Sequence, residues 1–190
     1  MLFRSTAASL ATVAGEPALA PISLMRREPP HPALPFAASG GQILFQPSAA
    51  SAWKTLPGLQ ELSRTDGVID LQVTAPEAAF EFALTKPLVA ATNQLLAIQL
   101  QNGTSAGLAR VFWAGVGEAF DPARSAWIPL VANDSELREY HCSLGLENSW
   151  RGSITRIRIE PATGLTERGT IKLGQIRWLK SPPVSRRSNL

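Results

Sequence analysis

The sequence predicts an all-β protein: an antiparallel jelly-roll β-sandwich of about nine or ten strands with an irregular, proline-rich N-terminal segment. From Gln42 onward, short stretches of alternating apolar and polar residues are separated by turn residues, and no stretch repeats apolar residues with a helical period. The stretch from Trp150 to Trp178 is the plainest example, with a glycine turn, an alternating strand, a proline stop, a loop and a closing strand. Many short strands without strand–helix alternation indicate a sandwich.

Turn residues and alternation delimit the individual strands. The expected strands are 42–46, 59–64, 68–74, 79–84, 93–101, 108–114, 127–131, 137–144, 154–160 and 170–179. Two glycines precede the first strand. Asp66-Gly67 joins the second strand to the third as a hairpin, because glycine tolerates positive φ. The fourth alternates large apolar residues with Glu81 and Ala83, and the fifth ends at a turn signal, Asn102-Gly103. Polar loops or prolines separate the remaining five.

Alternation also predicts which residues face the core, because successive side chains in a strand point to opposite faces. The residues expected in the core by this rule are Leu96, Ile98, Leu100, Val111, Trp113, Tyr140, Cys142, Leu144, Ile157 and Ile159. We interpret Trp150 and Trp178 as packing residues too, and leave both a core and a rim position open for Trp127. The last strand changes parity at Gly174-Gln175, which predicts a β-bulge.

Composition and charge fit one globular domain with tails. Of the 190 residues, 45% are hydrophobic and 17% are charged, which is enough for a real core. We divide the chain into a flexible Pro/Ala-rich segment (1–40), the sandwich (41–180) and a basic disordered tail (181–190). The net charge is +3, yet residues 42–179 hold 12 Lys/Arg against 13 Asp/Glu, so the excess lies in the tails. A nucleic-acid-binding domain would carry its charge on the fold, so we expect no nucleic-acid partner.

Several other classes of protein and site are disfavoured. With Cys142 as the only cysteine, the chain has no internal disulfide and no cysteine-based zinc site. No apolar run approaches the roughly 18 residues of a membrane-spanning helix, so we expect no membrane span. The stretch after Arg4 is a weak match to a secretion signal, since it is mostly Ala, Ser and Thr, and Pro21 would follow the cut. We favour a cytoplasmic over a secreted location and leave the compartment open.

Several segments resemble a known family. The segments that carry the resemblance are 131–140, 146–154, 157–161 and 169–173, together with Arg110-Val-Phe-Trp113 and Trp127-Ile-Pro-Leu130. They resemble the galactose-binding-like jelly-roll domains, the carbohydrate-binding-module-like sandwiches of bacterial glycan-processing proteins. The resemblance covers roughly residues 42–179. It implies a non-catalytic glycan-binding or accessory module. One alternative is a structural or protein-interaction sandwich, tethered to a partner by the N-terminal segment. A third is a degenerate enzyme-associated domain with no ligand.

Sugar recognition requires an aromatic face for the C–H face of a pyranose and fixed polar groups for its hydroxyls. The outward-facing side chains and one rim tryptophan provide both kinds of group. The candidate ligand-binding residues are Gln99, Gln101, Arg110, Phe112, Trp127, Arg156, Arg158 and Glu160. Arginine forks suit carboxylates or sulfates, which makes an acidic glycan conceivable. The alternative is a solvated face on which Arg156 or Arg158 pairs with Glu160.

No catalytic motif competes with this interpretation, so we expect no enzyme and no catalytic residues. His141 and Ser143 do not form a triad, and no phosphate-binding glycine loop is present. We expect no cofactor and no metal ligands; a structural calcium ion is the one group that the resemblance would allow. Gly174 counts against it, because family members often have an acidic residue there, and Glu160 replaces the usual aspartate.

Overall fold

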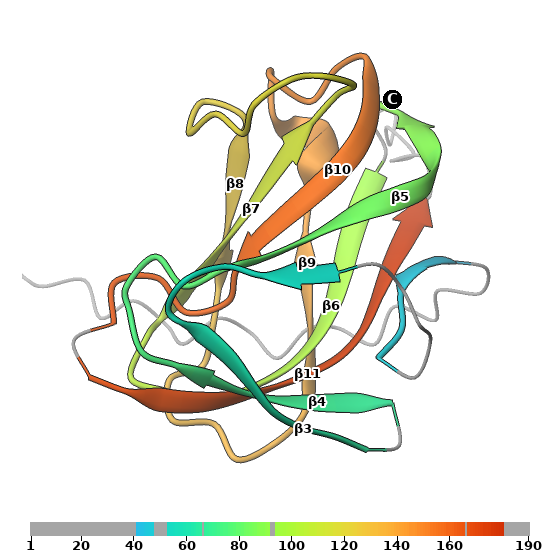
Figure 1. Cartoon of the computed structure of the whole chain (residues 1–190). Coiled ribbons are helices and arrows are strands. Elements are labelled where there is room, and N and C mark those ends of the chain that lie inside the picture. Colours follow the sequence, from blue (N-terminus) through green and yellow to red (C-terminus); the bar gives the residue numbers. More distant parts are fainter. Residues whose placement is uncertain (1–40, 48–52, 66, 92–93, 166, 181–190) are drawn as a thin grey trace, which may run out of the picture.

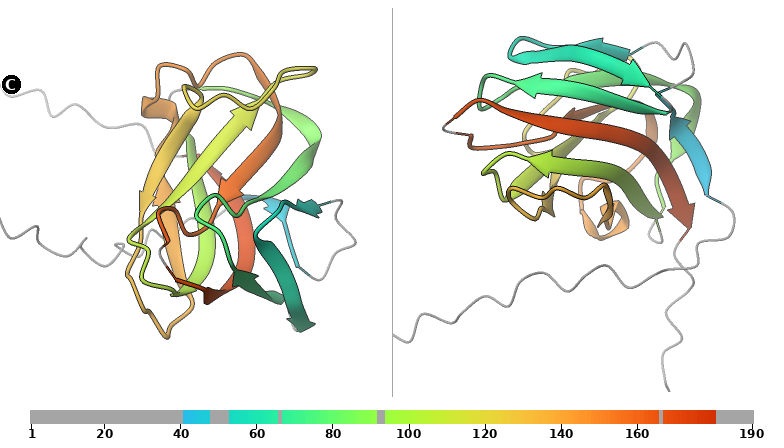
Figure 2. Two further views of the ribbon diagram at one scale, coloured as in Figure 1. Left: turned by 60° about the vertical axis from the view of Figure 1, so that its left-hand side comes forward. Right: turned by 90° about the horizontal axis from the view of Figure 1, so that it is seen from below.

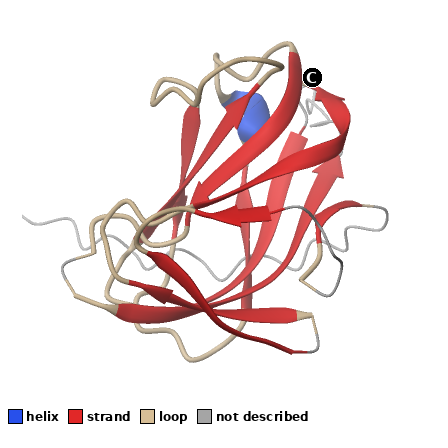
Figure 3. Ribbon diagram, in the orientation of Figure 1, coloured by secondary structure: helices blue, strands red, loops and turns tan. Residues whose placement is uncertain are grey.

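The computed structural model describes residues 41–47, 53–65, 67–91, 94–165 and 167–180. These residues form eleven strands and one short 3-10 helix, η1 (Figures 1 and 3). The strands are β1 (Gln42–Phe45), β2 (Trp53–Thr55), β3 (Leu59–Thr65), β4 (Val68–Val73), β5 (Phe80–Val89), β6 (Gln94–Gly103), β7 (Leu108–Ala114), β8 (Ser125–Pro129), β9 (Arg138–Cys142), β10 (Ser153–Glu160) and β11 (Gly169–Lys180), and η1 is Leu144–Leu146. The predicted N-terminal segment (1–40) and basic tail (181–190) lie outside the described residues.

The strands pack as two antiparallel sheets, as Figure 2 shows from two sides. In the six-stranded sheet A the order is β3-β4-β11-β6-β9, with β1 also pairing with β11. The five-stranded sheet B has the order β2-β5-β10-β7-β8. Strands that follow one another in the chain often lie in different sheets, so β5, β6 and β7 alternate between B, A and B. The predicted antiparallel β-sandwich is confirmed.

The core lies between the two sheets and contains nearly all of the residues that alternation predicted. Only Tyr140 differs, since it is half-buried at the edge of the core. Trp113, Trp150 and Trp178 are at most 6% exposed, and the ring of Trp150 lies 5.2 Å from each of the other two. The indole nitrogen of Trp113 donates to the Ser149 carbonyl and that of Trp150 to Gln94 Oε1. The indole N–H groups of Trp113 and Trp150 are therefore satisfied. Burial of all three tryptophans confirms their predicted packing role.

Many strand ends differ from prediction by one or two residues, and β8 lies two residues before its predicted range. Three further differences have a structural reason. Trp53 belongs to β2, a three-residue edge strand too short to show alternation. β5 continues past Pro87 to Val89, because the register of its pairing with β10 shifts there and the proline sits in the irregular part. Leu144 lies in η1 instead of β9, although it is buried as expected. The predicted bulge at Gly174 is confirmed by a register shift between Leu173 and Ile176.

Candidate functional site

The outer face of sheet B brings six of the eight candidate residues together. Arg158 on β10 lies between Glu81 of β5 and Phe112 of β7. One step along, Glu160 lies opposite Arg110, which in turn lies opposite Trp127 on the edge strand β8. The remaining member, Arg156, faces Ala83 and Ala114. Cross-strand neighbours are close enough to interact directly, so these side chains form one continuous surface.

The other two candidate residues, Gln99 and Gln101, belong to β6 in sheet A, on the opposite side of the sandwich. The expected single face is therefore two faces. Gln99 also has a structural partner there, since its Oε1 accepts a hydrogen bond from the Gln175 backbone N–H, 3.2 Å away. Alternation separates inside from outside, but only the pairing of distant strands decides which sheet a strand joins.

Arg110 and Trp127 form the most exposed aromatic feature of this surface. The Arg110 guanidinium lies between two rings, with Cζ 4.6 Å from the centroid of Phe112 and 4.7 Å from that of Trp127. Its Nε donates to Ser125 Oγ and its Nη2 to the Pro122 carbonyl, each at 2.9 Å. Trp127 is 49% exposed. The structure thus presents an open indole whose neighbour is held by hydrogen bonds and cation–π contacts.

Phe112 departs from the prediction, because it is only 5% exposed although it points away from the core. The Arg110 guanidinium lies over its ring. Phe112 is therefore part of the support for Arg110 and offers little surface to a ligand.

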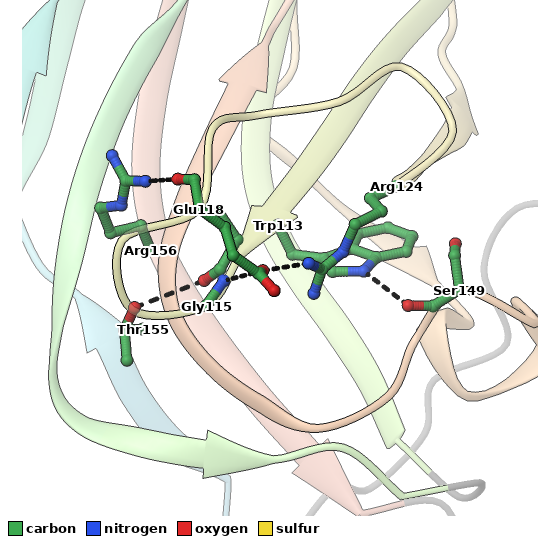
Figure 4. A network of polar contacts seen from close by, with 8 residues as sticks. Trp113, Gly115, Glu118, Arg124, Ser149, Thr155 and Arg156 are labelled. Atoms are coloured by element: carbon green, nitrogen blue, oxygen red, sulfur yellow. Dashed lines mark hydrogen bonds and ion pairs between the residues drawn. The ribbon is translucent and has the colours of Figure 1, made fainter.

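The loop 115–124 between β7 and β8 folds back toward the same face and adds residues that the sequence did not single out (Figure 4). Glu118 Oε2 accepts the Gly115 backbone N–H at 2.7 Å and pairs with Arg124. These hydrogen bonds hold the pKa of Glu118 below its ordinary value. The Glu118 carbonyl accepts a hydrogen bond from Arg156. Glu118 thus stabilises the loop internally through its carboxylate and connects the loop to β10 through its backbone carbonyl.

Phe120, in the same loop, lies over two of the candidate arginines. Its ring centroid is 5.0 Å from Cζ of Arg156 and 4.3 Å from Cζ of Arg158. Arg158 also donates to Glu81 at 3.3 Å, so its fork is already partly engaged. A lone phenylalanine in a polar loop was the only sequence signal for this contact. Arg158 is therefore less available to a ligand than the alternation pattern suggested, whereas Arg156 is covered by the ring but pairs with no carboxylate in the described chain.

Glu160 is the carboxylate of this surface that lacks an ion-pair partner within the described chain. Arg158 pairs with Glu81 on the other neighbouring strand, so the expected pairing of Arg156 or Arg158 with Glu160 is not formed. Burial raises the pKa of Glu160, assisted by the charge of Glu77 and opposed by those of Arg110 and Arg158. Glu160 thus offers hydrogen-bond acceptors directly beside the Arg110–Trp127 pair.

The possible metal ligands and the single cysteine can be placed among the described residues. No three His, Cys, Asp or Glu side chains there gather closely enough to hold a metal ion. At the bulge, a Cβ on Gly174 would lie 2.9 Å from Gln99 Cβ, so a longer residue could not enter without displacing that side chain. Burial raises the pKa of the Cys142 thiol to about 12, which keeps it protonated. Within the described segments there is also no helix of the length and apolarity that crossing a bilayer requires.

Solved structures with a similar fold include carbohydrate-binding domains. The second N-terminal cellulose-binding domain of a Cellulomonas fimi β-1,4-glucanase is 15% identical, with a TM-score of 0.51 over 76% of this chain and 97% of that domain. An agarase, AgWH50C, is 9% identical, with a TM-score of 0.52 over 76% of this chain and 25% of the agarase. The structure of PfGH50B is 14% identical, with a TM-score of 0.49 over 75% of this chain and 24% of that protein.

The chain therefore spans about a quarter of the length of the two larger proteins and nearly all of the cellulose-binding domain. Neither a protein-family profile nor a curated protein matches its sequence. At these identities the likeness shows the fold alone, which is the β-sandwich of carbohydrate-binding modules.

Proposed function

We propose that the protein is a non-catalytic glycan-binding or accessory module of a bacterial glycan-processing system. The observation that carries the proposal is the half-exposed Trp127 ring beside Arg110 and Glu160 on the outer face of sheet B. An exposed indole suits the apolar C–H face of a pyranose, and the two charged groups can donate to and accept from its hydroxyls. The fold shared with a cellulose-binding domain agrees with this proposal.

The support around Trp127 suits reversible recognition. Arg110 is held by Ser125, Pro122 and two rings, so little side-chain freedom remains to be lost on binding. A preorganised surface of this kind binds more tightly than a mobile one of equal area. The proposed mechanism is stacking and hydrogen bonding on a rigid sheet face, without bond chemistry.

A glycan-array screen of the full chain, followed by calorimetry on the best ligand, tests the proposal. Trp127→Ala should weaken binding about fivefold or more, because loss of stacking on one ring costs about 1 kcal/mol or more. Ile43→Ala on β1 is a matched control, since Ile43 is 50% exposed on the other sheet. Equal affinities for the Trp127→Ala variant and the unaltered protein would contradict the site.

The second candidate function is a protein-interaction sandwich. Among the described residues, the three most exposed large apolar side chains are Val116, Leu146 and Val89, at 82%, 80% and 74%. They belong to the β7–β8 loop, η1 and the end of β5, which Figure 1 shows at one end of the sandwich. The N-terminal segment that would tether a partner lies outside the described residues. A screen that finds no neutral or acidic glycan would favour this function over the first.

A further inference from the structure

A hollow of about 270 Å³ lies on the outer face of sheet B, toward its β2 edge. It is lined by Trp53, Lys54, Glu81, Phe82, Ala83 and Arg156. Ala83 lies beside Arg156 on the neighbouring strand, and its short side chain leaves the space between longer neighbours open. Trp53 and Phe82 belong to the aromatic group around Phe45 and provide an apolar boundary. The hollow is separate from Trp127, which lies on β8 at the opposite edge of the sheet.

The charges around the hollow are out of balance. Glu81 is its only carboxylate, and that carboxylate pairs with Arg158 at 3.3 Å. Lys54, directly across from Glu81, makes no ion pair in the part of the chain that the structure describes. Arg156 donates to the Glu118 carbonyl, a neutral acceptor, while the Glu118 carboxylate pairs with Arg124. Arg156 therefore feels the Glu118 carboxylate only at a distance, and neither cation at the hollow forms an ion pair within the described residues.

The spacing of these cations suits a single anionic group. Lys54 is on β2 and Arg156 is on β10, with β5 between them. Two strand intervals and a two-residue offset along the strands separate these residues by about 12 Å, a span that two long side chains can close around one carboxylate or sulfate. An anion between them would gain charge-assisted hydrogen bonds, and the apolar boundary would contact the ring that carries it.

We infer that this hollow binds the acidic substituent of a glycan, which is either the carboxylate of a sugar acid or a sulfate ester. This site is distinct from the exposed Trp127 ring. The inference rests on the proposed function, since it assigns a charge to the same ligand. It moves the acidic recognition that the sequence suggested away from Arg110 and Arg158 to Lys54 and Arg156. Arg158 is paired with Glu81, and Arg110 lies opposite the carboxylate of Glu160. Arg156 also contacts Phe120, but its hydrogen bond goes to the neutral Glu118 carbonyl.

Nuclear magnetic resonance titration of the full chain tests the site directly. The probes are glucose, glucuronate and inorganic sulfate, each at a fixed ionic strength set with KCl. The backbone amides of residues 53–54 and 81–83 should shift with an anionic probe and stay in place with glucose. A response to glucuronate alone identifies a carboxylate site, and a response to sulfate alone identifies a sulfate site. Absence of a localised response to either anion would overturn the inference.

Two charge-removing variants and one control complete the test. Lys54→Gln and Arg156→Gln should each lower the affinity for the anionic probe about fivefold, which is the effect of losing one exposed ionic contact. Lys54→Gln removes no ion pair or side-chain hydrogen bond within the described chain. It can therefore still test the site if Arg156→Gln disturbs the 115–124 loop. Lys172→Gln on the other sheet, where the side chain is 51% exposed, should change nothing. Equal weakening by all three variants would overturn the site in favour of general charge attraction.

Comparison of an acidic oligosaccharide with its neutral counterpart separates this inference from the proposed function. Preference for the acidic form, lost in Lys54→Gln, supports both. Equal affinities for the two forms overturn the acidic site and leave glycan binding at Trp127 intact. Absence of binding by either oligosaccharide overturns both.

Discussion

The ring of Phe120 lies over the guanidinium of Arg158, with 4.3 Å between Cζ and the ring centroid. This contact joins a loop residue to the middle of sheet B, because Arg158 is on β10, the central strand. The same ring lies 5.0 Å from Arg156 Cζ. Phe120 thus covers the centre of the outer face and leaves an exposed tryptophan toward one edge and a hollow toward the other.

Replacement of Phe120 should measure the strength of this cover. Phe120→Ala removes two cation–π contacts, and we expect it to lower the free energy of unfolding by about 1–2 kcal/mol in urea titrations. Phe120→Leu retains apolar cover without the ring, so it should recover only part of that loss. If the Phe120→Leu variant is as stable as the unaltered protein, the cation–π contacts of the ring contribute nothing to stability.

Glu160→Gln should change how stability depends on pH. Burial raises the pKa of Glu160 in the folded state, so the folded protein holds this proton more tightly than the unfolded chain. The contribution of Glu160 to folding stability is therefore most favourable below its pKa in the unfolded chain. It declines as the pH rises through its pKa in the folded protein. The glutamine variant lacks this decline, so its stability relative to the unaltered protein should increase across that window.

The measurement for Glu160 is urea unfolding at a series of pH values from mildly acidic to neutral. Glu147→Gln, a change at an exposed carboxylate in the loop after η1, serves as the control for loss of one surface charge. Parallel pH profiles for the Glu160→Gln variant and the unaltered protein would contradict the expected burial effect.

Asn102→Ala should be among the more destabilising single changes. Asn102 is fully buried, and its Nδ2 donates to the carbonyls of Ala106 and Val131 at 2.7 and 2.9 Å. Its Oδ1 accepts the Thr104 hydroxyl at 2.6 Å. Alanine would leave buried partners unsatisfied, at a cost of about 2–4 kcal/mol in denaturant unfolding. The neighbouring change Ser105→Ala, at an exposed side chain, should have almost no effect.

Two glycines with positive φ provide a matched pair. Gly58 (φ +87°) and Gly117 (φ +71°) should each lose about 1–2 kcal/mol of stability on replacement by alanine, from backbone strain. At Gly58 the added Cβ would lie 2.6 Å from the Ala75 Cβ, whereas at Gly117 nothing lies within 4 Å. Gly58→Ala should therefore cost about 1–3 kcal/mol more than Gly117→Ala. Equal melting temperatures for the Gly58→Ala and Gly117→Ala variants would contradict the expected steric cost at Gly58.

Much of the site could be predicted from strand alternation, as Arg156, Arg158 and Glu160 illustrate. All three point outward on β10, while Ile157 and Ile159 are buried. Their partners could not be predicted. Arg158 has a neighbouring strand on each side. It pairs with Glu81, 77 residues away in sequence, and not with a residue on its own strand. Phe120 was missed because a loop residue has no periodic pattern.

The sequence by itself determined the sandwich, the inward tryptophans and the bulge at Gly174, since these depend on local periodicity and on where a chain can turn. Tertiary structure decided which outward residues share a surface. β6 joins sheet A while β7 and β10 join sheet B, so Gln99 and Gln101 lie apart from Arg110. That choice depends on pairing between distant strands and on burying both inner faces together, which no local stretch encodes.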